Sequence, residues 1–339
     1  MSERWARRPE GSNWGDFGED DELGRLNLLT PERRLVATRE VRTGEVFCLS
    51  LPLDLPGGSA LNPVRQPPRR QVATRKGHAL VDFPVRLEDA RYVDCSCDDA
   101  VTLFTQYSTQ WDALAHVGQF FDADGDGVPE PVYYNGFRGG RDIVGPGADG
   151  GGACARRLGI ERMAETCVQG RGVLVDLHAH HGDQRVLVGY DDLMRVIEAD
   201  RVEIAPGDML CLHTGFAELV LAMAGNPDRA VLRHASPALN GRDARLLRWI
   251  DESGIAVLAA DNYAVEAFPN EPGAPGACEG LPLHQACLFR LGIHLGELWH
   301  LTPLARWLRQ HGRHHFLLTC PPLRLPGSFG SPVTPVATV

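Results

Sequence analysis

Lysine is almost absent from this chain: Lys76 is its one lysine, and the other basic residues among the 34 are arginines. Chemistry that depends on lysine, such as a Schiff base or a phosphate-binding P-loop, would therefore have to use Lys76. This residue lies in the polar run 69–76, which contains neither a Walker motif nor the apolar sequence of a buried lysine pocket. We exclude a lysine-centred mechanism on these grounds.

The chain also lacks an excess of positive charge and a long apolar segment. Its 34 basic and 44 acidic residues give a net charge of −10 and a pI of about 5.7, which disfavours a nucleic-acid-binding surface. Apolar runs such as 219–224 are far shorter than the ~20 residues of a membrane-spanning helix, and the first residues lack the apolar stretch of a signal peptide. We predict neither a nucleic-acid partner nor a membrane association.

Paired cysteines are missing as well. The nine cysteines include no C-x-x-C pair, and several lie in apolar, strand-like runs, such as Cys48, Cys211 and Cys320. A reduced cysteine in such a run behaves as a small hydrophobic residue. The spacing therefore argues against a zinc finger or a disulfide scaffold and favours a reduced, cytoplasmic protein.

The pattern along the chain predicts an α/β protein. With 339 residues, 43% of them hydrophobic, the chain can bury a large core. Residues 1–40 are polar and contain tryptophans, which favours an N-terminal arm or cap, and we expect residues 41–339 to form one α/β domain. Residues 57–76 are typical of a surface loop. Strands are expected at 44–53, 91–105, 172–177, 208–213, 255–260 and 316–318, and helices at 30–32 onward, 153–166, 191–199, 216–224 and 236–254.

Three histidines, His178, His180 and His181, follow the predicted strand 172–177. A strand that ends in H-x-H is typical of the metal-dependent amidohydrolase barrel. That barrel needs about 250 residues, and only 158 residues follow His181 in the 339-residue chain, so we exclude it. Two interpretations stay open, in which the histidines either line a cleft at the end of the strand or lie solvated in a loop.

The segment 105–116 is the most informative part of the sequence. It places a carboxylate and an imidazole four residues apart, at Asp112 and His116, among several amide and hydroxyl side chains. Such a pair is suited to acid/base chemistry, and it is equally found as a buried structural contact. The segment alone leaves both readings open.

The same segment resembles the signature H-x-G-T-H-x-D-x-P-x-H of the cyclase-type metal-dependent hydrolases, the family of bacterial kynurenine formamidase and isatin hydrolase. Thr109, Asp112 and His116 match defining residues of that signature. Later parts of the chain resemble the later elements of the family in the same order. These parts are the G-D…T-G strand at 207–215, the G-I…D element at 254–261, His284, the G-I…G-E-x-x-x-L stretch at 291–301 and the closing loop at 321–333.

The resemblance implies a swivelling β/β/α fold of the cyclase/kynurenine formamidase type, a homodimer, and hydrolysis of cyclic or acyl amides with one or two divalent metal ions. In relatives, the first two signature histidines, the signature aspartate, a late histidine and a late glutamate bind the metal. The third signature histidine is the acid/base. Carried over to this sequence, Asp112, His284 and Glu297 become metal ligands, and His116 becomes the acid/base.

The sequence departs from the signature where the family has its two leading histidines, because Gln106 and Gln110 stand there. Ser108 and Leu114 replace the signature glycine and proline. A glutamine offers a neutral carbonyl oxygen, which suits Mn²⁺ or Mg²⁺ better than Zn²⁺. We therefore expect one divalent ion, Mn or Zn, with an oxygen of Gln110 or Gln106 completing the ligand set. A site that binds no metal stays open as the alternative.

These observations lead to a hydrolase of a small cyclic or acyl amide, imide or lactone. Metal-activated water would attack the substrate, with His116 and Asp112 as the catalytic pair. Trp111 and Tyr134 are candidates for aromatic walls of a small-molecule pocket, or for core packing. Two alternatives stay open: a metal-independent cyclase, isomerase or dehydratase that uses Asp112 and His116, and a non-catalytic small-molecule binding protein.

Overall fold

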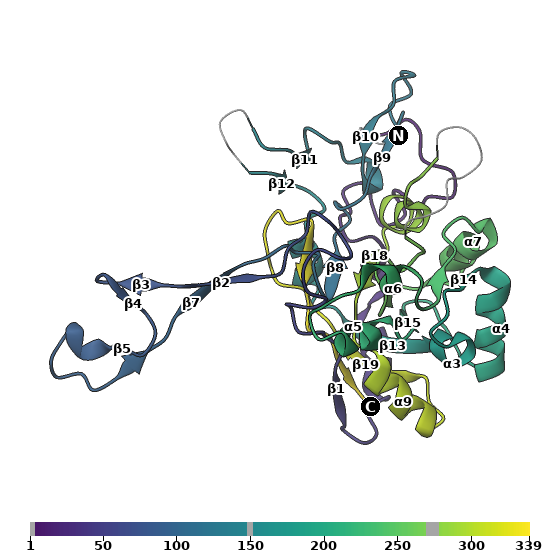
Figure 1. The fold of residues 1–339 in the computed structure, drawn as a ribbon. Helices are drawn as coiled ribbons and strands as arrows, with labels where there is room; N and C mark the ends of the chain where they lie inside the picture. Colours follow the sequence, from purple (N-terminus) through teal and green to yellow (C-terminus); the bar gives the residue numbers. More distant parts are fainter. Residues whose placement is uncertain (1–3, 148–151, 269–277) are drawn as a thin grey trace.

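A nine-stranded sheet forms the centre of the molecule (Figure 1). The structure is a computed structural model that describes residues 4–147, 152–268 and 278–339. Four neighbouring strands in the middle of the sheet are parallel, and the strands outside them are antiparallel. In spatial order the strands are β1 (Val46–Cys48), β21 (Val336–Thr338), β19 (His315–Thr319), β13 (Gln169–Asp176), β15 (Met209–His213), β17 (Val257–Ala260), β18 (His294–Glu297), β8 (Gln110–Asp112) and β20 (Gly330–Pro332).

The central strands are buried on both faces, which explains their nearly continuous apolar sequences. Alternate residues of β13 enter two different cores: Val173 and Val175 pack on one face, and Leu174 packs on the other. Side chains of α4 and α7 cover the first face, and side chains of α2 and α9 cover the second. The bounds of these helices are α2 (Ile160–Glu165), α4 (Tyr190–Asp200), α7 (Ala244–Glu252) and α9 (Thr302–Gln310).

The predicted mixture of buried strands and helices is confirmed, although the strand expected at 44–53 is confined to β1 and two helices are shorter than expected. The helix expected at 153–166 is confined to α2, because Cys154 and Ala155 form a strand, β12, that pairs with β11. The helix expected from Ser236 begins only at α7, where the side chain of Asp243 accepts hydrogen bonds from the amides of Arg245 and Leu246. Ala238 and Leu239, which precede it, form a short strand, β16, instead. The remaining short strands and helices of the body are β9 (Gln119–Phe121), β10 (Glu130–Val132), η3 (Tyr134–Gly136), β11 (Ile143–Val144), α3 (Leu177–His181), β14 (Leu187–Val188), α5 (Phe216–Ala222), α6 (Arg229–Arg233), β16 (Ala238–Leu239), α8 (Pro282–His284) and the π-helical turn η4 (Gln285–Arg290).

The N-terminal residues lie against the body of the protein. Trp14 is fully buried, and its indole N–H donates a hydrogen bond of 2.7 Å to the carbonyl of Phe289. Two helical segments follow, η1 (Gly24–Leu28) and α1 (Pro31–Thr38), and α1 packs against β13 and β19. The predicted helix start at Thr30 is confirmed, because the Thr30 hydroxyl accepts a hydrogen bond from the amide of Arg33.

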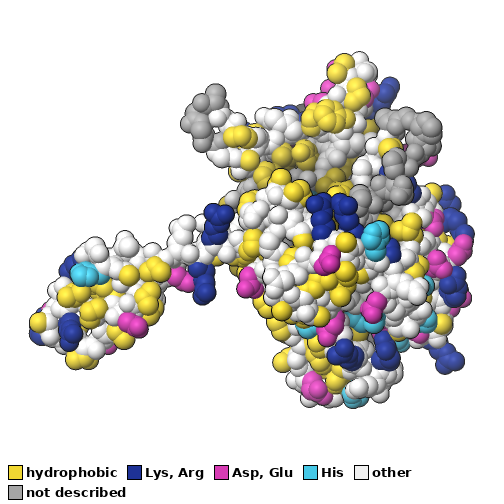
Figure 2. Space-filling model, in the orientation of Figure 1, with side chains coloured by type: hydrophobic (Ala, Val, Ile, Leu, Met, Phe, Trp, Pro, Cys, Tyr) yellow, Lys and Arg dark blue, Asp and Glu magenta, His cyan; other side chains and the backbone are white. Residues whose placement is uncertain are grey.

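A two-stranded arm projects from the body (Figures 1 and 2). The prediction of a surface loop at 57–76 is wrong for its second half, because residues 69–72 pair with residues 99–102 from the predicted strand region 91–105. Hydrophobic side chains are exposed along the arm, including Val93 at 96% and Val101 at 54%. The elements of the arm are β2 (Arg69–Val72), β3 (Thr74–Arg75), β4 (His78–Ala79), β5 (Phe83–Pro84), η2 (Val85–Leu87), β6 (Cys95–Ser96) and β7 (Asp99–Thr102).

Within the described ranges, no helix combines the length and the apolar character that crossing a bilayer requires.

Candidate metal and acid/base site

The site begins with the pairing of β8 and β18 near the edge of the sheet. In this antiparallel pair Gln110 lies opposite Glu297, and Asp112 lies opposite Leu295. Because side chains alternate along a strand, Gln110, Asp112 and Glu297 share one face of the sheet. The amide nitrogen of Gln110 donates a hydrogen bond of 3.1 Å to Glu297 Oε2. Strand pairing alone therefore gathers three of the predicted ligands.

A fourth predicted ligand, His284, comes from α8, which packs over the same face. Its Nε2 lies 3.2 Å from Glu297 Oε1 and 3.9 Å from Asp112 Oδ2. Its Nδ1 lies 2.8 Å from Glu266 Oε1, and Glu266 also accepts hydrogen bonds from the amides of Leu283 and His284. Glu266 thus fixes the ring so that Nε2 faces the carboxylates.

Three buried oxygen atoms in this cluster have no hydrogen-bond partner among the described residues: both carboxylate oxygens of Asp112 and the amide oxygen of Gln110. Asp112 is 0% exposed, so its carboxylate has no contact with bulk solvent that would replace a hydrogen-bond partner. A buried acceptor without a partner costs about 1–3 kcal/mol, and more when it is charged. The cluster therefore contains acceptor oxygens that a hydrogen-bond donor or a cation would stabilise.

The buried ionisable groups of the cluster shift one another's pKa values. Burial and the nearby charge of Glu297 raise the pKa of Asp112. Burial disfavours a charged His284, yet hydrogen bonds to Glu266 and Glu297 outweigh it and raise the pKa of this ring to about 10. Despite its burial, the hydrogen bond to His284 and the charge of that ring lower the pKa of Glu297, so its negative charge opposes ionisation of Asp112. A divalent cation beside both carboxylates would remove that opposition.

The residues fit a divalent metal ion on two grounds. Ligand atoms of Asp112, His284 and Glu297 all lie within 4.8 Å of one another, and the unpartnered oxygen of Gln110 lies on the same face. Carboxylate, imidazole and amide oxygen donors are a common ligand set for Mn²⁺ and, with fewer oxygens, for Zn²⁺. Asp112, His284, Glu297 and Gln110 would hold the ion.

Gln106 does not present a free oxygen. Its Oε1 accepts a hydrogen bond of 2.9 Å from Thr105 Oγ1, and its Nε2 donates one of 3.1 Å to the carbonyl of Phe329. The same nitrogen lies 3.3 Å from His116 Nδ1. Because both ends of the amide are occupied, Gln106 positions His116 in this arrangement, which differs from the predicted role as a ligand.

His116 lies on the turn that follows β8, beside the ligand cluster. Its Nε2 is 3.8 Å from Asp112 Oδ1. Burial, together with the positive charges of His284 and Arg65, lowers the pKa of His116 to about 4. The ring is therefore neutral at pH 7 and, with Nδ1 held by Gln106, directs Nε2 into the site.

The two aromatic residues predicted as pocket walls lie elsewhere. Trp111 occupies the opposite face of β8 from Asp112, with its N–H bonded to the carbonyl of Cys320 at 2.8 Å and its ring edge-on to Trp299. Tyr134 is 0% exposed, and its ring packs against Gly292. Both residues are therefore buried in the core. Strand alternation places Trp111 in the second core, away from Asp112, and Tyr134 lies in η3 within the first core.

The histidines of α3 also lie outside the cluster. His178 contacts Asp183 at 2.8 Å, and His180 contacts Asp200 at 3.0 Å, both near the surface. Two of the later motifs that resemble the family, at 207–215 and 254–261, contact each other through the backbone. The carboxylate of Asp261 accepts hydrogen bonds from the backbone amides of Thr214 and Gly215. These motifs tie adjacent strand ends together.

Comparison with known proteins identifies the family. The sequence model of a family described as "Putative cyclase" matches residues 49–267, which include Gln110, Asp112 and His116. The chain belongs to this cyclase family. A solved structure described as that of a novel cyclase is 31% identical to this cyclase-family chain, with a TM-score of 0.76 and 97% of both chains covered. No curated protein matches the sequence.

Two isatin hydrolase structures share the fold of this cyclase-family protein. Isatin hydrolase A from Labrenzia aggregata, bound to benzyl benzoate, is 14% identical with a TM-score of 0.54, and 91% of this chain and 99% of that chain are covered. An isatin hydrolase bound to the product analogue thioisatinate is 15% identical with a TM-score of 0.56 and the same coverage. The predicted cyclase-type α/β fold is confirmed.

Sequence reasoning missed two residues of the cyclase-family site. Glu266 fixes His284, and Arg65 donates a hydrogen bond of 2.6 Å from Nη1 to the carbonyl of Gln106. The position of Glu266 shortly after a predicted buried strand was the available signal, since polar residues at the ends of such strands often serve sites. Arg65 lies in a segment that looked like an exposed loop and carried no such signal.

Proposed function

We propose that this protein hydrolyses a small cyclic or acyl amide, imide or lactone. The observation that carries the proposal is the buried Asp112 carboxylate, whose two oxygens lack partners beside His284, Glu297 and the free oxygen of Gln110. Such a ligand set suits a divalent ion of the kind that activates water in metal-dependent hydrolysis. Membership in a cyclase family supports an enzyme, and the reaction class is our inference from the site.

The residues of the chain supply distinct parts of this reaction. Asp112, His284, Glu297 and Gln110 would bind a divalent ion, which polarises a carbonyl and acidifies water when bound. The low pKa of His116, about 4, keeps the ring neutral, and because Nδ1 accepts from Gln106, Nε2 carries the proton and can donate it to the leaving group. Gln106 orients that ring through Nδ1, and Glu266 orients His284.

Metal content is the first test. Elemental mass spectrometry on protein purified without chelator and without a histidine tag should find close to one Mn or Zn per chain. A screen of amides, imides and lactones should then find a substrate. Occupancy below about a tenth, even after addition of Mn²⁺ and Zn²⁺, would refute the proposal and favour metal-independent proton transfer at Asp112 and His116.

A second test separates an enzyme from a binding protein. His116→Ala should abolish turnover and leave metal content unchanged, because His116 lies beside the ligand cluster and is not part of it. Arg248→Gln, on the exposed side of α7, is a matched control that should retain full activity. Turnover that survives in His116→Ala would remove this residue from the reaction.

A further inference from the structure

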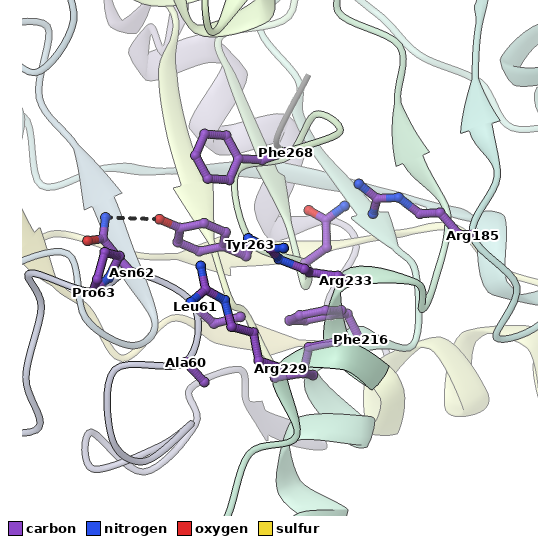
Figure 3. Close-up of a pocket in the computed structure, with 12 residues that line it drawn as sticks. Ala60, Leu61, Asn62, Pro63, Arg185, Phe216, Arg229, Arg233, Tyr263 and Phe268 are labelled. Carbon is purple, nitrogen blue, oxygen red and sulfur yellow. Dashed lines mark hydrogen bonds between the residues drawn. The ribbon is translucent and has the colours of Figure 1, made fainter. Parts of the chain in front are cut away.

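A cavity of about 270 Å³ gathers arginine and aromatic side chains (Figure 3). Arg185 enters from the loop before β14, and Arg229 and Arg233 enter from α6. Figure 3 shows the guanidinium groups of Arg229 and Arg233 close to the ring of Tyr263, and that of Arg185 pointing inward from the other side of the view. Phe216, Tyr263 and Phe268 supply aromatic surface. The volume lies near the lower end of the range for small-molecule sites, about 300–1,000 Å³.

The positive charge of this cavity is not compensated by the described part of the chain. There, none of Arg185, Arg229 and Arg233 forms an ion pair or a hydrogen bond, although most other arginines do. Arg229 and Arg233 are four residues apart on α6, where like charges repel. Burial also lowers the pKa of Arg185, so the cavity holds this charge at a cost in free energy. An oxyanion would remove the repulsion and supply the missing acceptors.

The arginine cavity borders a second cavity that reaches Gln106, the neighbour of His116. It shares Asn62 and Tyr263 with this narrow second cavity, which is lined by Arg65 and Gln106. Gln106 in turn contacts His116, as described above. The Asn62 amide donates a hydrogen bond of 3.3 Å to the Tyr263 hydroxyl at the boundary between the two cavities. A molecule held by the arginines would therefore lie beside the cavity whose wall includes Gln106, the residue that contacts His116.

We propose that the arginine cavity binds a carboxylate carried by the substrate, on a small aromatic or cyclic frame. The planar guanidinium forks match the two oxygens of a carboxylate, and Phe216, Tyr263 and Phe268 enclose the apolar frame. The bond to be hydrolysed then extends toward the narrow cavity and His116. This assignment rests on the proposed hydrolase function, because it names the substrate class of the same site.

The test measures ligand binding without turnover. Benzoate and its neutral counterpart benzamide are titrated into the full-length protein by isothermal titration calorimetry, with Arg185→Gln and Arg233→Gln as variants. We expect benzoate to bind at least tenfold more tightly than benzamide, and each variant to lose at least tenfold in benzoate affinity. Arg248→Gln removes an exposed arginine of α7 outside the cavity and should leave the affinity unchanged.

Several results would overturn the assignment. These are equal binding of benzoate and benzamide, unchanged benzoate affinity in both arginine variants, or an equal loss in Arg248→Gln. Phenyl phosphate that binds at least tenfold more tightly than benzoate would replace the carboxylate with a phosphate. Arg233 is exposed, so its variant should fold even if Arg185→Gln does not.

Failure of the carboxylate site and failure of the hydrolase proposal give different results. Asp112→Asn should lose metal and keep its benzoate affinity, because Asp112 does not line the arginine cavity. Benzoate binding without metal or hydrolysis would sustain the carboxylate site and refute the hydrolase. Hydrolysis of neutral amides without selective benzoate binding would sustain the hydrolase and refute the carboxylate site.

Discussion

Replacing Asp112 by Asn should have opposite consequences for the metal-free and the metal-bound protein. The carboxylate is fully buried and neither of its oxygens has a hydrogen-bond partner among the described residues, so in the metal-free fold it is an unfavourable group. Burial and the charge of Glu297 raise the pKa of Asp112 to about 8, so the metal-free group is largely an uncharged acid at pH 7 that still lacks hydrogen-bond partners, and a neutral amide of the same shape is no less favourable there. We therefore expect metal-free Asp112→Asn to equal the wild type in free energy of unfolding, or to exceed it by up to about 3 kcal/mol.

The metal-bound protein should show the reverse. A ligand at about one hundred times its Kd stabilises the native state by about 2.7 kcal/mol. For a chain of 339 residues the entropy of unfolding near the midpoint is about 0.7 kcal/mol/K. Addition of Mn²⁺ at that ratio should thus raise the Tm of the wild type by about 4 °C. The same addition should leave the Tm of Asp112→Asn unchanged, because the variant lacks an anionic ligand.

Differential scanning calorimetry with and without chelator measures both effects. Asp191→Asn provides a matched control, since this carboxylate is exposed and pairs with Arg245 on the surface. The control should keep the full metal-dependent shift. The reasoning fails if Asp112→Asn keeps that shift as well, or if its metal-free form is less stable than the wild type by more than about 1 kcal/mol.

Other predictions address the ligand set, the buried network and the arm. Glu297→Gln should lower metal occupancy and activity together, as measured by elemental mass spectrometry and turnover, and unchanged occupancy would remove Glu297 from the ligands. Asp176 is largely buried, yet hydrogen bonds from His213 and Arg309 lower its pKa to about 2. The ionised carboxylate therefore contributes about 2 kcal/mol to the free energy of unfolding above pH 4, and this contribution is lost as the pH falls toward 2. The difference in urea unfolding between wild type and Asp176→Asn should therefore shrink from pH 7 to pH 3, and a constant difference would contradict this linkage. The expected homodimer stays a prediction. A two-stranded ribbon is only marginally stable alone, so we expect the arm to be covered by the second subunit, and replacement of residues 67–103 by a short Gly-Ser linker should convert a dimer to a monomer in light scattering. A full-length chain that is itself monomeric would refute the homodimer.

The sequence predicted the parts of the fold that depend on local pattern. The buried runs at 172–177, 208–213 and 255–260 became β13, β15 and β17, because continuous apolar stretches of this length suit strands covered on both faces. A strand was expected at 91–105, but its pairing into an arm could not be foreseen, because the two strands lie about 30 residues apart and both are exposed along their length. Pairing between exposed strands leaves no hydrophobic alternation to detect.

The site residues, too, fall into those that local spacing predicts and those that depend on long-range contacts. Asp112 and His116 were identifiable from their spacing, and His284 and Glu297 only from the resemblance to a family, because nothing in the chain indicates that β8 and α8 meet β18. The roles of the two glutamines depended on hydrogen bonds to distant residues. Phe329, far along the chain, occupies the amide of Gln106, whereas Gln110 keeps a free oxygen. Long-range contacts of this kind are not contained in a local motif.

The contrast between the glutamines makes a prediction about the identity of the metal. The available donors are oxygens of Asp112, Glu297 and Gln110 and one nitrogen of His284, a set richer in oxygen than zinc sites usually are. Gln110→His would replace an amide oxygen with an imidazole nitrogen. Since imidazole favours Zn²⁺ over Mn²⁺, we expect the ratio of zinc to manganese affinity to rise at least tenfold in this variant.

Competition titrations with a chromogenic chelator measure the ratio for both metals. Gln106→His is the informative comparison, because the amide of Gln106 is already bonded to Thr105 and Phe329 and faces His116. That variant should change the pH dependence of turnover more than the metal preference. A shift toward zinc in Gln106→His and not in Gln110→His would reverse the two roles and place Gln106 among the ligands.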